Sequence, residues 1–277
     1  MIKFTAPARA RLAKLVAEQG GLPYSAVRRL LRGKDIKLNG KRVNTDLTCE
    51  KGDLIEVYVR LDAEKQALDS LYVDENVLVF NKPSGITSED FYDKVRAEYP
   101  TARAVHRLDR NTRGIIAYAL TDVAEEALLY GFKQRTFTKL YLAEVIGRPK
   151  QDEATLSAYL NKDAVTGTVY IHDRKQPGDV QIKTAYRVLR SSGNTSVLEV
   201  ELLTGRTHQI RAHLSHIGHP IIGDEKYGDT AVNKIYRSTR QHLQAYRLVL
   251  RFEEDSPLYY LNGREFTLPP AFGKEEV

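Results

Sequence analysis

The spacing of apolar and polar residues predicts two helices and a β-hairpin in the first sixty residues. A helical pattern covers 9–19 and ends at Gly20-Gly21. A second covers 24–32, and its polar side carries three arginines, Arg28, Arg29 and Arg32. Residues 36–43 then alternate around Asn39-Gly40, a strong signal for a two-residue hairpin turn, and a further strand pattern covers 54–59. This order predicts a small α/β unit at the start of the chain.

The rest of the chain is richer in strand patterns than in helical ones. Strand patterns cover 76–81, 140–145 and 198–202, and helical patterns cover 88–99, 122–132 and 207–217. Because strands and helices do not alternate strictly, we expect an α+β fold with a mixed, largely antiparallel sheet on which the helices pack. Residues 61–70 lack an apolar pattern. The predicted domains are therefore 1–62 and 71–277, joined by a linker at 63–70, with a frayed tail at 273–277.

Composition narrows the class of protein. The 277 residues are 42% hydrophobic and 28% charged, which predicts a globular chain and excludes intrinsic disorder of the whole. No apolar run is long enough for a membrane span or a secretory signal, so we expect a cytoplasmic protein without membrane contact. A single cysteine, Cys49, permits no internal disulfide and no cysteine-built metal site, which suits a reducing compartment.

The charge is unevenly distributed along the chain. Residues 1–60 contain 13 Lys and Arg against 6 Asp and Glu, whereas the remainder contains 29 against 30. A basic segment before a near-neutral body is typical of an attached nucleic-acid-binding unit, because Lys and Arg displace the counterions of a polyphosphate. The alternative is a solvated basic face without a partner.

Several short polar motifs stand out in the second part of the chain. They are HRLD at 106–109 followed by Thr112 and Gly114, a strand with Lys139 and Tyr141, and TGRTHQIR at 204–211. Each is ordinary by itself, since an Asp three residues after a His is usually a cap or a loop salt bridge. Their order and spacing make the combination specific.

Together with NKPSG at 81–85, these motifs resemble the RluA-type pseudouridine synthases, and the likeness spans 69–277. Residues 9–60, with VRRLLRGKDIKLNGKRVN and GDLIEVYV, resemble the S4 RNA-binding domain. The resemblance implies an RNA pseudouridine synthase, an isomerase that needs no cofactor. It also implies a structured RNA as partner, ribosomal RNA in preference to tRNA. Nothing in the sequence suggests more than a monomer.

The family motif assigns Asp109 as the catalytic carboxylate. A carboxylate enclosed beside a nucleobase needs a nearby cation to stay ionised, and we expect Arg206 to be that partner. Tyr141 offers a flat ring to stack on the uracil and a phenolic oxygen to take part in removing the C5 proton.

The target base must leave the stack before C1′ and C5 are accessible, and the resemblance implies that Arg107 enters the vacated space. A phosphate contact or a surface ion pair is the alternative for Arg107. Further RNA contacts are expected from His106, Arg110, Lys82, Lys139 and His208, and in the first unit from Arg28, Arg29 and Arg32.

Two other interpretations remain open. His208, His213, His216 and His219 lie close to Asp224 in sequence, but their spacing does not suit a metal site and no HExxH motif is present, so no metal is expected.

An RNA-binding paralogue without activity is the second alternative. Three departures from the usual family text keep this alternative open: Arg113 within the motif that commonly reads TSG, Gln244 in place of His, and ITSE after NKPSG. Because Asp109, Tyr141 and Arg206 are present, we expect these changes to affect substrate choice more than catalysis, with Arg113 as a candidate specificity contact.

Overall fold

The structure, a computed structural model, describes residues 1–22, 24–58, 68–164, 166–236, 238 and 240–272. The chain divides into two compact units, Met1–Ala67 and Leu68–Val277. Most of the predicted linker and the predicted frayed tail lie outside the described residues. No helix in the described ranges has the length and apolar character to cross a membrane.

The first unit contains the helices and the hairpin that the sequence predicts. Helices α1 (Leu12–Gly20) and α2 (Tyr24–Arg32) share a core with a four-stranded antiparallel sheet. The strand order is β1 (Ile2–Thr5), β6 (Leu54–Val57), β3 (Ile36–Leu38) and β4 (Lys41–Val43), and β2 (Ala10–Arg11) pairs separately with β5 (Thr48–Cys49). Asn39 and Gly40 both have positive φ, at 49° and 79°, as a two-residue hairpin turn with the twist of its strands requires. The strand β1 has no counterpart among the predicted elements.

On α2, Arg28 and Arg32 are exposed, as the helical pattern predicts. The side chain of Arg29 lies outside the described residues.

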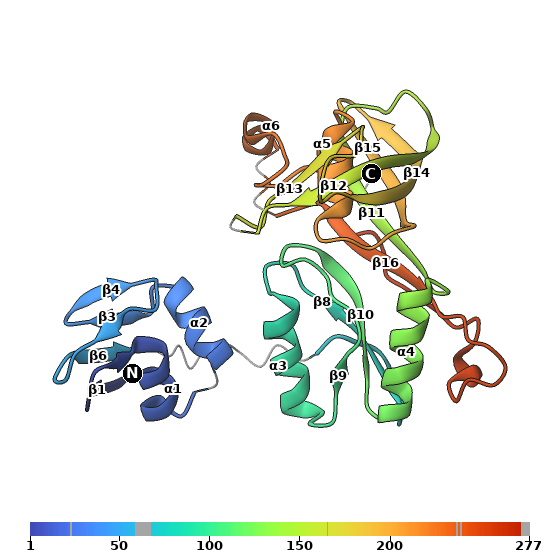
Figure 1. Cartoon of the computed structure of the whole chain (residues 1–277). Coiled ribbons are helices and arrows are strands. Elements are labelled where there is room, and N and C mark those ends of the chain that lie inside the picture. The colour runs from blue at the N-terminus through green and yellow to red at the C-terminus, as the bar shows by residue number, and fades with distance from the viewer. Residues whose placement is uncertain (23, 59–67, 165, 237, 239, 273–277) are drawn as a thin grey trace. The chain divides into compact units, whose positions relative to one another are not determined.

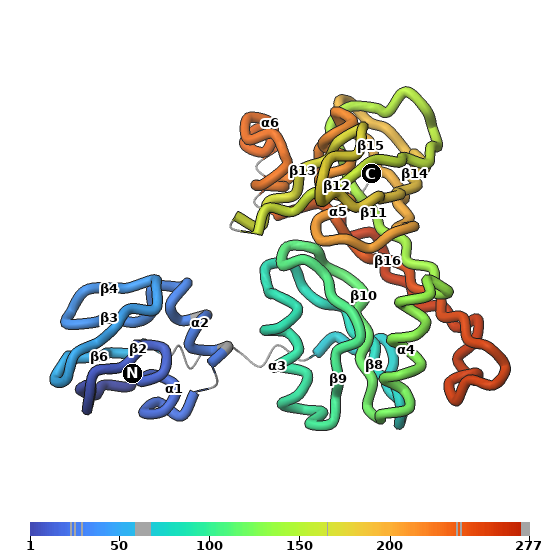
Figure 2. Tube along the Cα trace, in the orientation of Figure 1, coloured from blue at the N-terminus to red at the C-terminus, as the bar shows by residue number. Residues whose placement is uncertain are grey.

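The second unit is built on an eleven-stranded sheet (Figures 1 and 2). Its main path runs β13 (Val169–His172), β12 (Glu153–Lys162), β14 (Val180–Ser192), β15 (Thr195–Leu202), β11 (Thr138–Ile146), β16 (Leu243–Val249), β10 (Arg113–Ala119), β8 (Val77–Lys82) and β7 (Ser70–Val73). The short strands β9 (Arg103–Ala104) and β17 (Glu265–Thr267) pair with β10 and β16. Every described ladder is antiparallel except that between β10 and β16. The predicted α+β class with a mixed, largely antiparallel sheet is confirmed.

Helices cover both faces of the sheet where β8 and β10 lie (Figure 1). Successive residues of a strand point to opposite faces, so Leu78 and Phe80 enter one core with α3 (Ser88–Glu98). Val77 and Val79 enter the other core with α4 (Asp122–Gln134). This two-sided burial explains why 76–81 reads as a nearly continuous apolar run.

The parallel junction of β10 and β16 explains the glycine of the HRLDxxTxG motif. Gly114 lies opposite Ala245 with a φ of 116°, and a Cβ at Gly114 would stand 2.1 Å from the Ala245 carbonyl oxygen. Only glycine tolerates both the close approach and this backbone conformation. The junction thus fixes the loop that contains Asp109 against β16.

The described part of this unit also contains two more helices and a 3-10 turn. They are α5 (Gln209–His216), α6 (Thr230–Ile235) and η1 (Tyr259–Leu261). The helix predicted over 207–217 is therefore confirmed with a later start, because His208 adopts the left-handed conformation with a φ of 55°.

Candidate active site

Three distant stretches of chain line one hollow of about 280 Å³. The loop before β10 contributes Asp109, β11 contributes Tyr141, and the turn between β15 and α5 contributes Arg206. The convergence of these stretches, on which the sequence prediction depends, is thus present in the fold. His106, Arg107, Lys139 and His208 line the same hollow.

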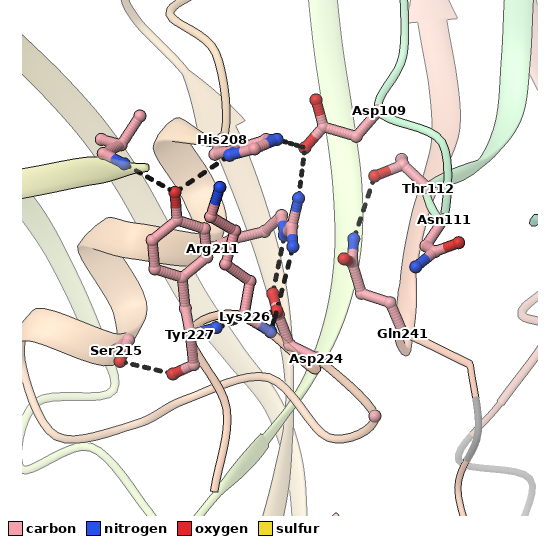
Figure 3. A network of polar contacts seen from close by, with 12 residues as sticks. Asp109, Asn111, Thr112, His208, Arg211, Ser215, Asp224, Lys226, Tyr227 and Gln241 are labelled. Carbon is pink, nitrogen blue, oxygen red and sulfur yellow. Dashed lines mark hydrogen bonds and ion pairs between the residues drawn. The ribbon is translucent and has the colours of Figure 1, made fainter. Parts of the chain in front are cut away.

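The guanidinium that holds Asp109 belongs to Arg211. Its Nη1 donates to Asp109 Oδ2 at 3.1 Å, from a side chain that is only 9% exposed (Figure 3). Arg206 is exposed at the rim of the hollow, and none of its side-chain atoms has a described ion pair. The prediction that Arg206 is the ionic partner of Asp109 is therefore wrong. Because α5 begins only after the left-handed His208, Arg211 enters the helix on its buried side and Arg206 remains in the turn before it.

The sequence does contain a signal for Arg211. Arg211 lies three positions before the buried Leu214, so it shares that side of the helix. A cation on the buried side of a helix requires a carboxylate partner, since an unpaired buried charge is costly. That signal identifies Arg211 as a buried cation without naming its partners.

A second carboxylate, Asp224, fixes Arg211 from the opposite side. Arg211 Nε donates to Asp224 Oδ2 at 2.7 Å, and Nη2 donates to Oδ1 at 3.0 Å (Figure 3). Oδ1 of Asp224 also accepts the backbone N–H groups of Lys226 and Tyr227. Burial lowers the pKa of Arg211, but the bonds and charge of Asp224 and then Asp109 more than compensate, so that its pKa is raised. The guanidinium is therefore a fixed positive charge beside Asp109. Asp224 had no role in the sequence prediction outside the metal alternative.

Tyr141 presents an un-ionised phenol to the hollow. It lies on β11 at an irregularity of the pairing with β16, and it is 7% exposed. Burial raises the pKa of the Tyr141 hydroxyl, and the charge of Asp109 raises it further. The ring thus keeps its proton and offers a flat, apolar face with a polar end.

The loop that contains Asp109 is held by buried polar side chains. Ser88 Oγ donates to the Leu108 carbonyl at 2.8 Å and accepts the Leu108 N–H at 2.9 Å. Gln241 Nε2 donates to the Thr112 hydroxyl at 3.0 Å (Figure 3). These bonds attach the residues on both sides of Asp109 to α3 and to the segment before β16.

Lys82 belongs to this supporting set. The side chain is fully buried, and Nζ donates to the carbonyls of Pro83 at 3.0 Å, Ile86 at 2.8 Å and Arg110 at 3.3 Å. Burial lowers the pKa of Lys82 to about 8, against the opposing charges of Asp109 and Glu89. The prediction that Lys82 contacts the RNA backbone is therefore wrong, because its three donors are used inside the protein.

His106 also supports the site from within. Its Nε2 accepts the Ala117 N–H at 2.9 Å, and its ring lies 4.4 Å from that of Phe132. Burial, followed by the charge of Lys139, lowers the pKa of His106 to about 3. A neutral imidazole with this nitrogen occupied holds β10, and the RNA contact expected at His106 stays a prediction.

Four other residues predicted to contact RNA contact neighbouring protein groups in the structure. Arg107 is 70% exposed and forms an ion pair with Glu89 at 3.0 Å. Arg110 is exposed, and its Nε donates to the Gly85 carbonyl at 3.2 Å. Lys139 lies 5.3 Å above the Phe132 ring. His208 bonds through Nδ1 with the Tyr227 hydroxyl at 2.9 Å, and its Nε2 stands 3.9 Å from Asp109 Oδ2.

The histidines of the metal alternative each have a different partner. His213 bonds with Thr184, His216 with Asp173, and His219 with the Ile146 carbonyl. Within the described ranges no group of three His, Cys, Asp or Glu side chains is placed to hold a metal ion.

The Gln244 departure has a structural explanation. Gln244 is 2% exposed, its Nε2 donates to the Pro269 carbonyl, and its Oε1 accepts the Ala271 N–H, each at 2.9 Å. The amide therefore fastens the C-terminal segment to β16. Arg113 lies opposite Gln244 across the parallel ladder, and it does not line the hollow.

Comparison with known proteins agrees with this arrangement. The family model described as RNA pseudouridylate synthase matches residues 76–216. A ribosomal large subunit pseudouridine synthase C from Vibrio cholerae is 32% identical over 234 residues, which cover 75% of this chain and 73% of the relative. Its counterpart from Haemophilus ducreyi is 30% identical over 267 residues, covering 86% of this chain and 82% of that protein.

A solved structure extends the likeness to the fold. Human RNA pseudouridylate synthase domain containing 1 has a TM-score of 0.63 and 27% identity, and it covers 76% of this chain and 86% of its own. The matched segment contains the loop of Asp109, the strand of Tyr141 and the helix of Arg211. The chain belongs to the RNA pseudouridylate synthase family and is an isomerase of the RluA type.

Proposed function

We propose that this chain converts specific uridines of ribosomal RNA to pseudouridine, with Asp109 as the catalytic carboxylate. The observation that carries the proposal is the Asp109 carboxylate, 20% exposed, facing a nucleotide-sized hollow while Arg211 fixes it at 3.1 Å. The names of the bacterial relatives favour ribosomal RNA of the large subunit as the substrate class.

The chemistry requires no oxidant and no energy input. The N1–C1′ bond of uridine breaks, the uracil turns, and a C5–C1′ bond forms. The proton at C5 then leaves to solvent, and N1 takes one up, so atoms and electrons balance. A carboxylate that acts at the sugar or the base, together with a group that removes the C5 proton, is sufficient.

Arg211 orients Asp109 and places a fixed positive charge beside it. A guanidinium does not give up its proton at any relevant pH, so the carboxylate retains a cationic partner when a nucleobase displaces water from the hollow. Asp224 holds the other edge of the guanidinium, so Arg211 has one orientation available. Asp224 is thus a positioning residue for the catalytic carboxylate.

Tyr141 and Arg107 act on the base and on the stack it leaves. The Tyr141 ring stacks on the uracil, and its hydroxyl takes part in the transfer of the C5 proton. Arg107, exposed at the mouth of the hollow, enters the space that the extruded nucleotide leaves, and Glu89 releases it when RNA binds. Breaking this ion pair is inexpensive because both side chains are exposed.

The first unit supplies additional RNA affinity as an S4-like domain. Its exposed Arg28 and Arg32 and its excess of basic residues support this role. The match to the Haemophilus ducreyi relative covers more of this chain than the second unit contains, so the relative shares part of the first unit. Removing residues 1–62 should weaken RNA binding and flatten its salt dependence. An unchanged salt slope would exclude this role.

Release of tritium from C5 of uridine tests the proposed reaction. Large-subunit ribosomal RNA transcribed with [5-³H]uridine should lose label to water when the wild-type chain is added. Asp109→Asn should abolish the release and leave RNA affinity largely intact, because the side chain keeps its size and loses only its charge. Equal release by both proteins would contradict the assignment of Asp109.

The same assay decides the alternative of an inactive RNA-binding paralogue. That protein would bind the transcript without releasing tritium. Mapping pseudouridines in total RNA with and without the protein then identifies the uridine that is modified.

A further inference from the structure

A second hollow of about 330 Å³ opens beside the candidate active site. It lies between the C-terminal end of α4, the start of β11 and the turn after β15. Lys139, Gly205 and Arg206 line both hollows, so the two share a rim. The second hollow is therefore within reach of the nucleotides that neighbour one bound in the first hollow.

Four cations from three separate elements line this second hollow. Lys133 and Arg135 come from the end of α4, Lys139 from β11, and Arg206 from the turn before α5. Within the described part of the chain, none of the four has an ion pair with a carboxylate, and Glu201 is the single acidic residue of the lining. We refer to this lining as the basic groove.

The helix dipole accounts for only part of this charge. The C-terminal end of a helix favours cations, which explains Lys133 and Arg135 without any ligand. It does not explain why Lys139 and Arg206 are brought to the same place from other elements. Arg135 also has a φ of 62°, a conformation that bulky residues adopt at a cost and that glycine usually supplies at a helix end.

The cations of the groove act on one another. Burial lowers the pKa of Lys139, and the charge of Arg135 lowers it further. Burial, and after it the charge of Lys139, lowers the pKa of His106, inside the first hollow. Positive potential therefore extends from the basic groove to the rim of the active site, and an anion bound there would relieve the repulsion.

We propose that the basic groove binds the phosphate groups of the RNA strand that flank the target uridine, with Lys133 and Arg135 as its outer contacts. This inference rests on the proposed function, because the strand is placed by the nucleotide in the active site. An extruded nucleotide is linked to a phosphate on either side. These negative charges complement the cations of the basic groove, which begins at the rim of the active-site hollow. Phosphate contacts of this kind position a strand without reading its sequence.

The double variant Lys133→Ala/Arg135→Ala tests the proposal, with Lys150→Ala/Arg251→Ala as its matched control. Each removes one exposed lysine and one exposed arginine, and the control residues line neither hollow. The affinity for the ribosomal RNA transcript is measured between about 50 and 200 mM salt, and the rate of tritium release is measured over a range of RNA concentrations up to saturation.

The groove variant should show a shallower dependence of affinity on salt. Two lost phosphate contacts reduce the slope of log K against log salt by about 1.4–1.8. The ratio of wild-type to variant affinity should therefore fall roughly sevenfold to twelvefold between about 50 and 200 mM salt. The control should keep the wild-type slope. Because neither Lys133 nor Arg135 touches the reacting atoms, KM should rise while kcat stays within about twofold.

The outcomes separate the two hypotheses. Tritium release by the wild type, with equal salt slopes for the wild type and the groove variant, would overturn the basic groove alone. Equal reductions in the groove variant and the control would overturn it as well, by showing a general effect of surface charge. A wild type that releases no tritium would overturn the proposed function, while a reduced slope in the groove variant alone would still support phosphate binding by these cations. Far-ultraviolet circular dichroism confirms that each variant is folded.

Discussion

Replacing Arg211 by methionine should destabilise the protein strongly, whereas the same change at Arg206 should not. Arg211 is 9% exposed and donates two hydrogen bonds to Asp224 and one to Asp109. Methionine approximates the length of the side chain and removes its charge and its donors. Arg206 is exposed and has no described side-chain ion pair, so Arg206→Met is the matched control.

The size of the effect follows from the carboxylate that remains. The Asp224 side chain is 1% exposed, and without Arg211 it keeps only its backbone donors. Removing one partner of a buried ion pair costs about 3–5 kcal/mol, because the other charge is left buried. A substitution at an exposed position without such contacts usually changes the free energy of unfolding by less than about 0.5 kcal/mol.

The destabilisation should depend on pH. Burial raises the pKa of Asp224, but the bonds from Arg211 outweigh it and hold the pKa below its ordinary value. The stabilisation by this carboxylate is therefore present above the unfolded-state pKa of about 3.9 and is lost as the pH falls through the lower folded-state value. In Arg211→Met the effect of burial prevails and the carboxyl group is favoured in its neutral form. The difference between the two proteins should thus be largest near pH 7 and should narrow below about pH 4.

Urea unfolding followed by tyrosine fluorescence measures the difference, since the chain has 16 Tyr and no Trp. Both variants and the wild type are compared at neutral and acidic pH, and tritium release is measured in parallel. We expect Arg211→Met to lose activity and stability together, and Arg206→Met to retain stability. A loss below about 1 kcal/mol for Arg211→Met, or a loss independent of pH, would refute the ion-pair reasoning.

Three further substitutions test other parts of the site. Lys82→Met should lower the free energy of unfolding by about 3 kcal/mol or more, because three buried carbonyls lose their donor. Urea unfolding measures this loss, with the exposed Lys150→Met as control. A loss no larger than that of the control would contradict the buried role of Lys82. Tyr141→Phe keeps the ring, so RNA affinity in filter binding should stay within about twofold while the rate of tritium release falls about 100-fold, and an unchanged rate would exclude the hydroxyl from proton transfer. Burial lowers the pKa of His213 to about 4, so the wild type should lose up to about 3 kcal/mol of stability from this group as the pH falls from about 6.5 to 4. His213→Gln should lack that part of the loss in urea unfolding at the two pH values, and parallel losses in both proteins would show that another group is responsible.

Some parts of this protein could be predicted from its sequence because they depend on local patterns. The period of apolar residues identified α1, α2 and β8, and Asn39-Gly40 identified the hairpin turn, since these signals arise within a few residues. The motif around Asp109 identified the family and the carboxylate. Its glycine is required by a junction that the motif itself does not reveal, the parallel ladder with Ala245.

Other parts were decided by tertiary structure alone. Arg206 and Arg211 lie five positions apart in one motif, and either satisfies the chemical need for a cation beside Asp109. The choice depended on the left-handed turn at His208 and on a contact across 102 positions of sequence. Likewise, no local pattern distinguishes a surface lysine from Lys82, whose three carbonyl partners lie in two separate loops.

The sequence by itself therefore determined several of the elements, the family and the carboxylate for which we propose the catalytic role. Tertiary structure decided which cation holds that carboxylate, which polar side chains support its loop, and which cations line the basic groove. The physical reason is that the backbone responds to neighbours along the chain, whereas the partner of a charged side chain is fixed by the order and register of strands and by the burial that the assembled sheet imposes.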